Sequence, residues 1–379
     1  MKITILKQWL NEAIQHVSKA ISSKTTIPIL TGVKLDVTDQ GVTLTASDID
    51  TTIQASIPAE TQDGAEIVKI ERTGSVVLPA KFFVEIIKKL PKDEVSIETD
   101  ASFTTTIKSG KTKIDMVGMD PEEFPVVPAL SDGQTISIPG SDLKDLIKET
   151  AFAISTNESS PILTGVKWEL QPGKLNLLAT DRHRLATAAM EIDEKVKPAT
   201  FVISGKTLNE LIKIIPDKGE PVGISVSKSQ VLFRIGEVQF YSRLLDGTFP
   251  DTSKIVPTSF KSELVVKTKS LVEALDRAFL MAREEKTNIV RIEAAGESAV
   301  SIESASSGLG KVNEQLEAES IDGDAVRISF NCKYMLDALK VIDSEHVKMG
   351  FTGAMSPIIV TPTDGKESLY LILPYRTAN

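Results

Sequence analysis

Apolar and polar residues alternate along this chain with two periods, which predict two kinds of element. In residues 10–21 the apolar residues Leu10, Ile14, Val17 and Ile21 recur at intervals of three and four, as in an amphipathic helix. Residues 33–37 and 42–46 instead alternate with a period of two and are separated by the polar turn Asp39-Gln40-Gly41. The pattern therefore predicts a helix followed by an antiparallel hairpin.

This pattern occurs three times at a spacing of about a third of the chain. The helical stretches that begin at Leu10, Leu143 and Leu271 are 133 and 128 residues apart. A second helical stretch begins at Lys81, Lys206 and Lys333, with spacings of 125 and 127. Each unit is large enough to hold its own core, so the repeat indicates three similar domains rather than a solenoid of short repeats. We expect domains at 1–127, 128–256 and 257–379.

Each unit reads as an α+β domain. It opens with a strand (3–6, 135–138 and 264–267), followed by the first helix and an alternating hairpin. A second helix follows and ends at Pro91, at Pro216 or near Asp343, and further strands close the unit. Both helices need a sheet to cover their apolar faces, so we expect two helices packed on antiparallel sheets of six to eight strands per domain.

The chain of 379 residues has a net charge of −9, which by itself argues against binding to nucleic acid. The charge is unevenly distributed, however. The six predicted helical segments hold 14 Lys and Arg against 9 Asp and Glu, a balance of +5, which leaves −14 for the rest. Such segregation allows one face to meet an anionic polymer, although lysine is also simply a good helix former.

Few residues are suited to catalysis. The chain has three His and one Cys, and it lacks paired Cys or His at zinc-binding spacing, a complete phosphate loop and a serine-nucleophile elbow. Asp48 with Asp50, and Asp322 with Asp324, are better explained by turn chemistry than by a metal site. We expect no metal, no cofactor and no enzymatic activity. Cys332 is expected to be a buried apolar residue, and the chain to be cytoplasmic, with no signal peptide or membrane span.

One polar cluster is unusual. The segment Thr180-Asp181-Arg182-His183-Arg184-Leu185 fills the hairpin turn that the first repeat fills with Ser47-Asp48-Ile49-Asp50. Two Arg and a His at a turn can bind phosphate, shape a pocket or place an acid-base group. A solvated turn whose His packs its ring on its neighbours is the favoured explanation of this composition.

Four motifs in order along the chain resemble the bacterial DNA sliding clamps, the beta subunits of DNA polymerase III. They are Pro-Ile-Leu-Thr-Gly at residue 28, the segment 180–185, Leu-Asp-Gly-Thr-Phe-Pro at 245–250 and Leu-Ile-Leu-Pro-Tyr-Arg at 371–376. The resemblance implies a head-to-tail homodimer that closes a six-domain ring around duplex DNA, with helices lining the hole. Such a ring tethers the replicative polymerase and other partners, including the clamp loader. Sliding needs backbone contacts without base readout.

The resemblance also assigns residues. The partner-peptide pocket of the family falls on Leu163, Thr180, His183, Arg184, Leu185, Pro250, Ile255, Leu371, Leu373, Pro374, Tyr375 and Arg376. The chain departs from the family pattern at Arg182, where glycine is common, and at Pro161-Ile162, where some members carry aromatic residues.

For DNA, the family places a basic residue at Lys24, and we add the helix residues Lys7, Lys81, Lys88, Lys206, Lys213, Arg277 and Lys340. For the dimer, Lys111, Lys113 and Ile114 of one chain are expected to meet Leu280 and Met281 of the other. Glu303, Glu314 and Glu317 are candidates for opposite charge, although residues 304–316 depart from the family pattern.

Two alternatives remain open at this point. One is an enzyme that uses His183 in phosphate ester chemistry, which would need a base or metal that the sequence does not supply. The other is a triplicated adaptor that binds proteins only. Stoichiometry, and retention on circular but not linear DNA, distinguish the clamp from this adaptor.

Overall fold

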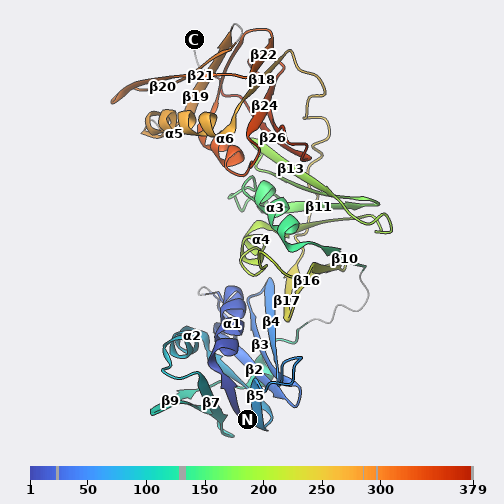
Figure 1. The fold of residues 1–379 in the computed structure, drawn as a ribbon, viewed down its shortest axis with the longest axis vertical. Coiled ribbons are helices and arrows are strands. Elements are labelled where there is room, and N and C mark those ends of the chain that lie inside the picture. Colours follow the sequence, from blue (N-terminus) through green and yellow to red (C-terminus); the bar gives the residue numbers. More distant parts are fainter. Residues whose placement is uncertain (23–24, 128–133, 285, 296–297, 377–379) are drawn as a thin grey trace. The chain divides into compact units, whose positions relative to one another are not determined.

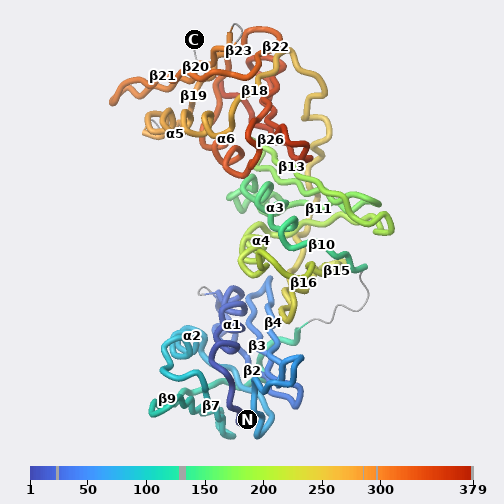
Figure 2. Tube along the Cα trace, viewed as in Figure 1, coloured from blue at the N-terminus to red at the C-terminus, as the bar shows by residue number. Residues whose placement is uncertain are grey.

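The computed structural model describes residues 1–22, 25–127, 134–284, 286–295 and 298–376. The chain forms two compact units (Figures 1 and 2). The N-terminal unit comprises residues 1–141 and 210–244, and the C-terminal unit comprises 142–209 and 245–379. The middle repeat is thus divided between the two units.

The first repeat contributes two helices and nine strands to the N-terminal unit. These are β1 (Lys2–Leu6), α1 (Lys7–Val17), β2 (Gly32–Thr38), β3 (Gly41–Ser47), β4 (Thr51–Pro58), β5 (Val68–Arg72), β6 (Gly74–Pro79), α2 (Ala80–Lys89), β7 (Glu94–Thr99), β8 (Thr104–Ser109) and β9 (Thr112–Val117).

The middle repeat supplies two helices and eight strands, and α4 lies where the chain passes from one unit to the other. Its elements are β10 (Thr135–Ile138), α3 (Gly140–Ala151), β11 (Gly165–Gln171), β12 (Lys174–Thr180), β13 (Arg184–Glu191), β14 (Ala199–Ser204), α4 (Gly205–Leu211), β15 (Val222–Val226), β16 (Gln230–Ile235) and β17 (Val238–Arg243).

The third repeat lies wholly in the C-terminal unit and again has nine strands. They are β18 (Ser262–Lys267), β19 (Ile289–Ala295), β20 (Ala299–Ser306), β21 (Gly310–Glu317), β22 (Ser320–Gly323), β23 (Val326–Asn331), β24 (His346–Phe351), β25 (Ile358–Pro362) and β26 (Ser368–Ile372), with α5 (Thr268–Glu284) and α6 (Cys332–Leu339). Short 3-10 turns, among them η2 (Pro28–Thr31) and η4 (Pro161–Thr164), precede β2 and β11.

The sequence therefore predicted both helices of each repeat, although α1 ends at Val17 rather than Ile21 and α4 at Leu211 rather than Pro216. The expected six to eight strands per repeat is too low for the first and third repeats, which have nine. The extra strands include the short β5 and β22, which are too short to show a period. Every strand pair in the described residues is antiparallel, as expected.

Hydrophobic burial holds the helices on the sheets. In α1 the residues Leu10, Ala13, Ile14 and Val17 are buried, and the helix contacts β3, β4 and α2. Complete burial of one such Leu or Ile stabilises the fold by about 2 kcal/mol. In the C-terminal unit α5 packs beside α6 and against β19, β20 and β21 (Figure 1). No helix in the described ranges is long and apolar enough to cross a membrane.

The sheets run across the boundaries between repeats. One sheet has the order β10-β15-β16-β17-β4-β3-β2-β6 and joins the middle repeat to the first. A second, β14-β11-β12-β13-β26-β25-β24-β18-β22, joins the middle repeat to the third. The remaining sheets, β5-β1-β7-β8-β9 and β21-β20-β19-β23, each belong to one repeat. Within the described residues, β9 and β21 therefore each end one of these sheets with an edge that has no strand partner.

A buried carboxylate lies between the middle and third repeats. Glu149 of α3 is 8% exposed, and its Oε1 is 3.4 Å from Nζ of Lys366. Burial raises the pKa of Glu149, and Lys366 opposes that shift. A carboxyl whose folded pKa exceeds its unfolded value binds protons more tightly in the folded state, so protonation stabilises the fold.

We therefore expect the free energy of unfolding of the wild type to rise, relative to Glu149→Gln, as pH falls from neutrality through the raised folded pKa toward the unfolded value. Urea unfolding of both proteins from pH 7.5 to pH 4.5 measures this difference. A difference that stays constant, or that moves the other way, would show that the carboxylate is not held in an unfavourable environment.

Candidate functional site

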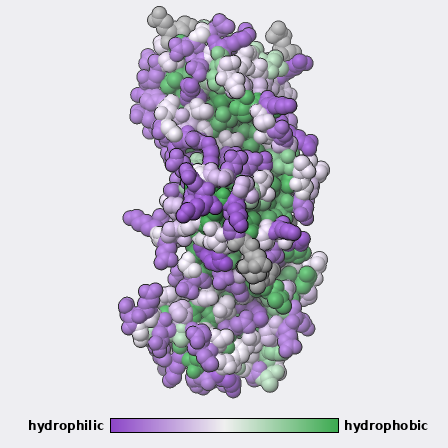
Figure 3. All heavy atoms as spheres, turned by 90° about the vertical axis from the view of Figure 1, so that its right-hand side faces the viewer, coloured by the Kyte–Doolittle hydropathy of each residue, from purple (hydrophilic) through white to green (hydrophobic). Residues whose placement is uncertain are grey.

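An apolar cluster lies on the face of the second sheet that points away from the helices. Leu178, Leu185, Ile359 and Leu371 form it, with Phe249, Val256, Phe260 and Leu369 packed against it. Strand register brings the cluster together, because Leu185 and Ile359 both lie opposite Leu371. Figure 3 views the side opposite α5 and shows hydrophobic residues among hydrophilic ones. The four central side chains of the cluster are themselves buried, at 2–6% exposed.

Two predicted pocket residues, Leu185 and Leu371, belong to this apolar cluster, and others lie along the segment that follows β26. Leu373 donates its backbone N–H to the carbonyl of His183 at 2.9 Å, and Tyr375 donates to Ser329 at 2.7 Å. Leu373 is 39% exposed and Tyr375 52%. This C-terminal segment thus presents two large apolar side chains to solvent beside the hairpin turn at 181–184.

A cavity of about 430 Å³ lies next to this turn. Its lining includes the predicted residues Leu163, His183 and Arg184. It also includes Lys333 and Tyr334 of α6, which no sequence motif had identified as site residues. The described structure does not place Pro250, Ile255, Pro374 or Arg376 in this lining. The assignment of the complete pocket stays a prediction.

The hairpin turn is organised by Asp181. Its Oδ1 accepts backbone N–H groups of His183 at 2.9 Å and Arg184 at 3.0 Å. In the first repeat Asp48 does the same for Asp50 and Thr51, at 2.9 and 2.6 Å. Aspartate is favoured in such turns for this reason. Asp48 and Asp181 are therefore turn residues, and the described residues contain no group of three or more His, Cys, Asp or Glu suited to a metal.

Arg182 has a backbone φ of 75°. This left-handed region costs an ordinary residue about 1 kcal/mol, and glycine adopts it freely. The glycine that is common in the family at this position is thus explained by the turn geometry. The Arg182 side chain extends outward and donates from Nη2 to Oγ of Ser160 at 3.1 Å.

Arg184 connects three parts of the C-terminal unit. Its guanidinium donates to Asp181 Oδ2 at 3.0 Å, to Asp337 Oδ2 at 2.6 Å and to the carbonyl of Phe152 at 2.7 Å. The same group lies 4.5 Å from the ring centroid of Tyr334, over its face, and His183 stacks on that ring with centroids 6.4 Å apart. Arg184 is therefore satisfied within the chain, and its main role is to hold the turn against α3 and α6.

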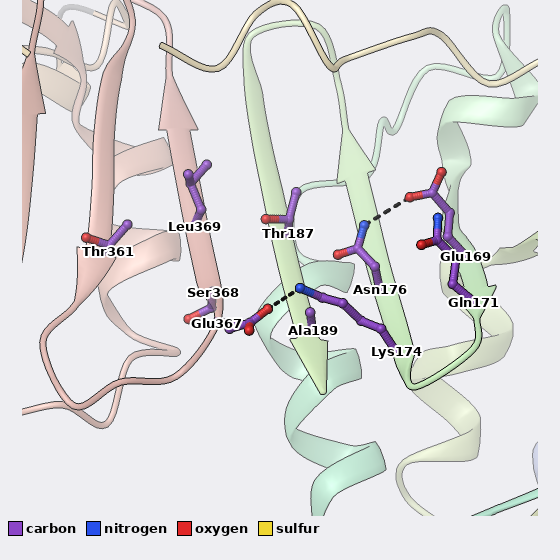
Figure 4. A pocket seen from close by; sticks show the side chains of 10 residues that line it. All are labelled: Glu169, Gln171, Lys174, Asn176, Thr187, Ala189, Thr361, Glu367, Ser368 and Leu369. Atoms are coloured by element: carbon purple, nitrogen blue, oxygen red, sulfur yellow. Dashed lines mark hydrogen bonds and ion pairs between the residues drawn. The ribbon is translucent and has the colours of Figure 1, made fainter. Parts of the chain in front are cut away.

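A second cavity, of about 490 Å³, lies further along the same sheet face (Figure 4). Its lining is largely polar. Lys174 of β12 pairs with Glu367 beside β26, and Asn176 donates to Glu169 at 3.0 Å. These side chains satisfy one another, so this cavity is a polar margin of the sheet rather than a site with an unused group.

Most of the residues predicted for DNA binding have partners in the chain. Lys7 donates to the carbonyl of Leu90 at 2.6 Å, and the ammonium of Lys81 lies 5.8 Å from the ring centroid of Phe82. Three further residues form ion pairs: Lys213 with Glu210, Arg277 with Glu314 and Lys340 with Asp276. Lys88 and Lys206 are exposed, and Lys24 lies outside the described residues. Exposed ion pairs are weak, so their cations remain available to phosphate, and the assignment stays a prediction.

The edge residues predicted for the dimer lie on β9, on the turn before it and on α5. Ile114 is half-buried, Lys113 is exposed, and Leu280 is 48% exposed. Glu314 of β21 forms a two-pronged pair with Arg277 of the same chain, at 2.8 Å for both oxygens. Within the chain Glu314 is therefore already paired with Arg277, although an exposed pair of this kind is weak. Cys332 is buried, and burial raises the pKa of its thiol to about 12.

The fold and site define a class of protein: tandem repeats joined by shared antiparallel sheets, with a buried apolar cluster beside an exposed C-terminal segment. Models of the DNA polymerase III beta subunit match residues 1–128 (N-terminal domain), 137–251 (central domain) and 253–376 (C-terminal domain). The chain belongs to this family.

Named relatives cover the whole chain. The Beta sliding clamp of Bacillus subtilis is 46% identical over 378 residues, which is 100% of both chains. The crystal structure of the DNA polymerase sliding clamp from that organism matches with a TM-score of 0.97 at 45% identity, covering 100% of both. The beta chain of DNA polymerase III from Streptococcus pneumoniae matches with a TM-score of 0.95 at 34% identity, covering 99% of this chain and 100% of that one.

Proposed function

We propose that this chain is a non-enzymatic processivity clamp, in which two copies join head to tail and close a ring of six domains around duplex DNA. Family membership supports this function. The C-terminal segment and the partly buried side chains around the apolar cluster would bind short motifs of the replicative polymerase, the clamp loader and other partners. The basic helix residues would face the DNA backbone. The protein would act in the cytoplasm, and its domain boundaries would lie at 127/128 and 256/257.

The way the repeats are joined within the chain supports ring closure, because equivalent strands pair at both internal junctions. At the first junction β17 pairs with β4, and Phe240 lies opposite Ile53. At the second, β26 pairs with β13, and Tyr370 lies opposite Ala186. All four side chains are at most 1% exposed. Each junction therefore buries an apolar pair where two repeats meet.

Strand registers identify the equivalents of these residues at the two free edges. On the β9 side, Ile3, Ile136 and Leu264 face Ile97, Ile224 and Met349. On the next strand of each sheet, Ile107, Phe233 and Val360 lie opposite Ile97, Ile224 and Met349, respectively. Ile107, Phe233 and Val360 in turn face Ile114, Phe240 and Tyr370. Ile114 thus occupies the position that Phe240 and Tyr370 occupy at the internal junctions.

The same reasoning applies to β21. Lys34, Lys167 and Arg291 face Thr45, Leu178 and Glu303. These three in turn face Gln54, Thr187 and Asn313. Ile53, Ala186 and Val312 directly precede Gln54, Thr187 and Asn313 in the sequence. Val312 is therefore the equivalent of Ile53 and Ala186. Val312 and Ile114 are both partly exposed, whereas their equivalents are buried.

We therefore infer that β21 of one copy pairs with β9 of the other, with Val312 opposite Ile114. A second contact supports this register. Phe152 packs on Tyr370 at the internal junction, with ring centroids 5.9 Å apart. The helix repeat makes Leu280 the equivalent of Phe152, so Leu280 would contact Ile114 of the other copy, as the family resemblance implies. Pairing of the two edges would also satisfy their free backbone groups.

Cysteine cross-linking tests this register. In Ile114→Cys/Val312→Cys, the new thiols would lie directly opposite one another, close enough to form a disulfide. We expect oxidation to give a covalent dimer on a non-reducing gel, without interference from the buried Cys332. In the matched control Ile114→Cys/Asn313→Cys the second thiol points to the other face of the sheet, and no link is expected.

Equal cross-linking of both variants would contradict the register. A ladder of higher oligomers would contradict closure by two chains, because a head-to-tail contact that does not close builds a filament.

A further inference from the structure

Two exposed hydrophobic side chains of this chain have no role in the sites above. Phe82 on α2 is 61% exposed, and Leu309 in the turn between β20 and β21 is 64% exposed. An exposed phenylalanine on a helix surface loses the stabilisation that burial would give it. Within the chain its ring meets the ammonium of Lys81, 5.8 Å from the centroid.

The repeat provides a template for both residues. The second helices align with Lys81 on Lys333, so Phe82 corresponds to Tyr334, and Phe83 corresponds to Met335. The alignment is supported by burial, because Phe83 and Met335 are both 0% exposed. Val312 is the equivalent of Ala186, so two and three residues earlier in the sequence Gly310 corresponds to Arg184 and Leu309 corresponds to His183.

At the junction of the middle and third repeats these template residues touch. The ring of His183 stacks on that of Tyr334, with centroids 6.4 Å apart and an interplanar angle of 21°. His183 comes from the hairpin turn that leads into β13, and Tyr334 from the helix of the next repeat. The contact joins the two repeats at one end of the shared strand pair.

We propose that Leu309 of one copy packs on Phe82 of the other and forms an apolar anchor at the end of the β21–β9 strand pair. This inference rests on the proposed function, since it requires the head-to-tail contact. It adds one residue pair to that contact. The turn that holds Leu309, Ser307-Gly308-Leu309, carries no charge, so the contact is apolar where Arg184 and His183 make the internal junction polar.

The dimer dissociation constant tests the proposal. We expect Phe82→Ala and Leu309→Ala each to raise it about tenfold, because a truncated anchor in an interface costs more than 1 kcal/mol. The double variant should raise the dissociation constant much less than one hundredfold, because the second truncation removes a contact that the first has already abolished. Sedimentation velocity over a dilution series of the full chain provides the measurement.

Met355→Ala is the matched control, because Met355 is a large hydrophobic residue, 53% exposed, at a position that the template does not bring to the interface. All the truncated side chains are exposed, so the monomer should keep its thermal stability. Singles that leave the dissociation constant unchanged, or a double variant whose effect is the product of the singles, would overturn the anchor.

A failure of the anchor differs from a failure of the ring. If the wild type dimerises and the Ile114→Cys/Val312→Cys pair cross-links while Phe82→Ala has no effect, only the anchor is wrong. If the wild type stays monomeric at all concentrations, the head-to-tail contact itself is wrong, and the anchor falls with it.

Discussion

Arg184→Ala is expected to lower the free energy of unfolding by about 3 kcal/mol, because it leaves two carboxylates without their cation. The arginine side chain is 11% exposed, and those of Asp181 and Asp337 are 13% and 30% exposed. The substitution also removes the hydrogen bond to the carbonyl of Phe152 and the contact with the Tyr334 ring. Urea unfolding of the full chain provides the measurement.

Arg182→Ala is the matched control for this prediction. Arg182 belongs to the same turn but is exposed, and its side chain donates a single hydrogen bond within the described residues, to Ser160. Loss of that side chain should change the free energy of unfolding by less than about 0.5 kcal/mol. Arg184→Lys should also be less stable than the wild type, because the single ammonium of lysine lacks the planar fork with which the guanidinium reaches both carboxylates and the carbonyl. Equal effects of Arg182→Ala and Arg184→Ala would mean that the Arg184 contacts contribute little.

The second large effect is expected at the C-terminal segment that follows β26. Leu373→Asp should weaken binding of a peptide carrying the clamp-binding segment of the replicative polymerase about 100-fold, because it places a charge where the partner buries apolar side chains. Leu373 is 39% exposed and follows β26, so the substitution should leave the fold intact. Fluorescence anisotropy of the labelled peptide measures the affinity.

Val126→Asp serves as the control, since Val126 is 92% exposed and lies in the other compact unit. Peptide affinity should be unchanged in this variant. Full affinity in Leu373→Asp would remove the C-terminal segment from the partner site.

The local elements could be predicted because each is written in a short stretch of sequence. The spacing of Leu10, Ile14 and Val17 predicted α1, and the alternation in 33–37 and 42–46 predicted the hairpin of β2 and β3. Pairing between repeats could not be predicted in the same way. Nothing in the pattern of β4 specifies β17, more than 180 residues away, as its partner, because a strand buried on one face shows the same alternation beside any neighbour.

The candidate site was predicted in part for a similar reason. The family motifs identified Leu185 and Leu371, which the fold brings together in the apolar cluster. Composition drew attention to Arg184, but its role depends on Asp337, 153 residues away, and on the Phe152 carbonyl, which no local pattern contains. Tyr334 was missed because its spacing reads as an ordinary helix position. The signal that could have found it is its alignment with Phe82, an exposed aromatic residue at the equivalent position of the first repeat.

The central claim is that two copies form a closed ring around DNA, and topological retention tests it most directly. The protein is loaded by its clamp loader on nicked circular plasmid, and bound protein is measured before and after a single restriction cut. We predict that the protein stays on the circle and is lost from the linear product, because a ring without tight contacts slides off free ends. Equal retention on linear DNA with free ends would mean that affinity rather than encirclement holds the protein, and would contradict the ring.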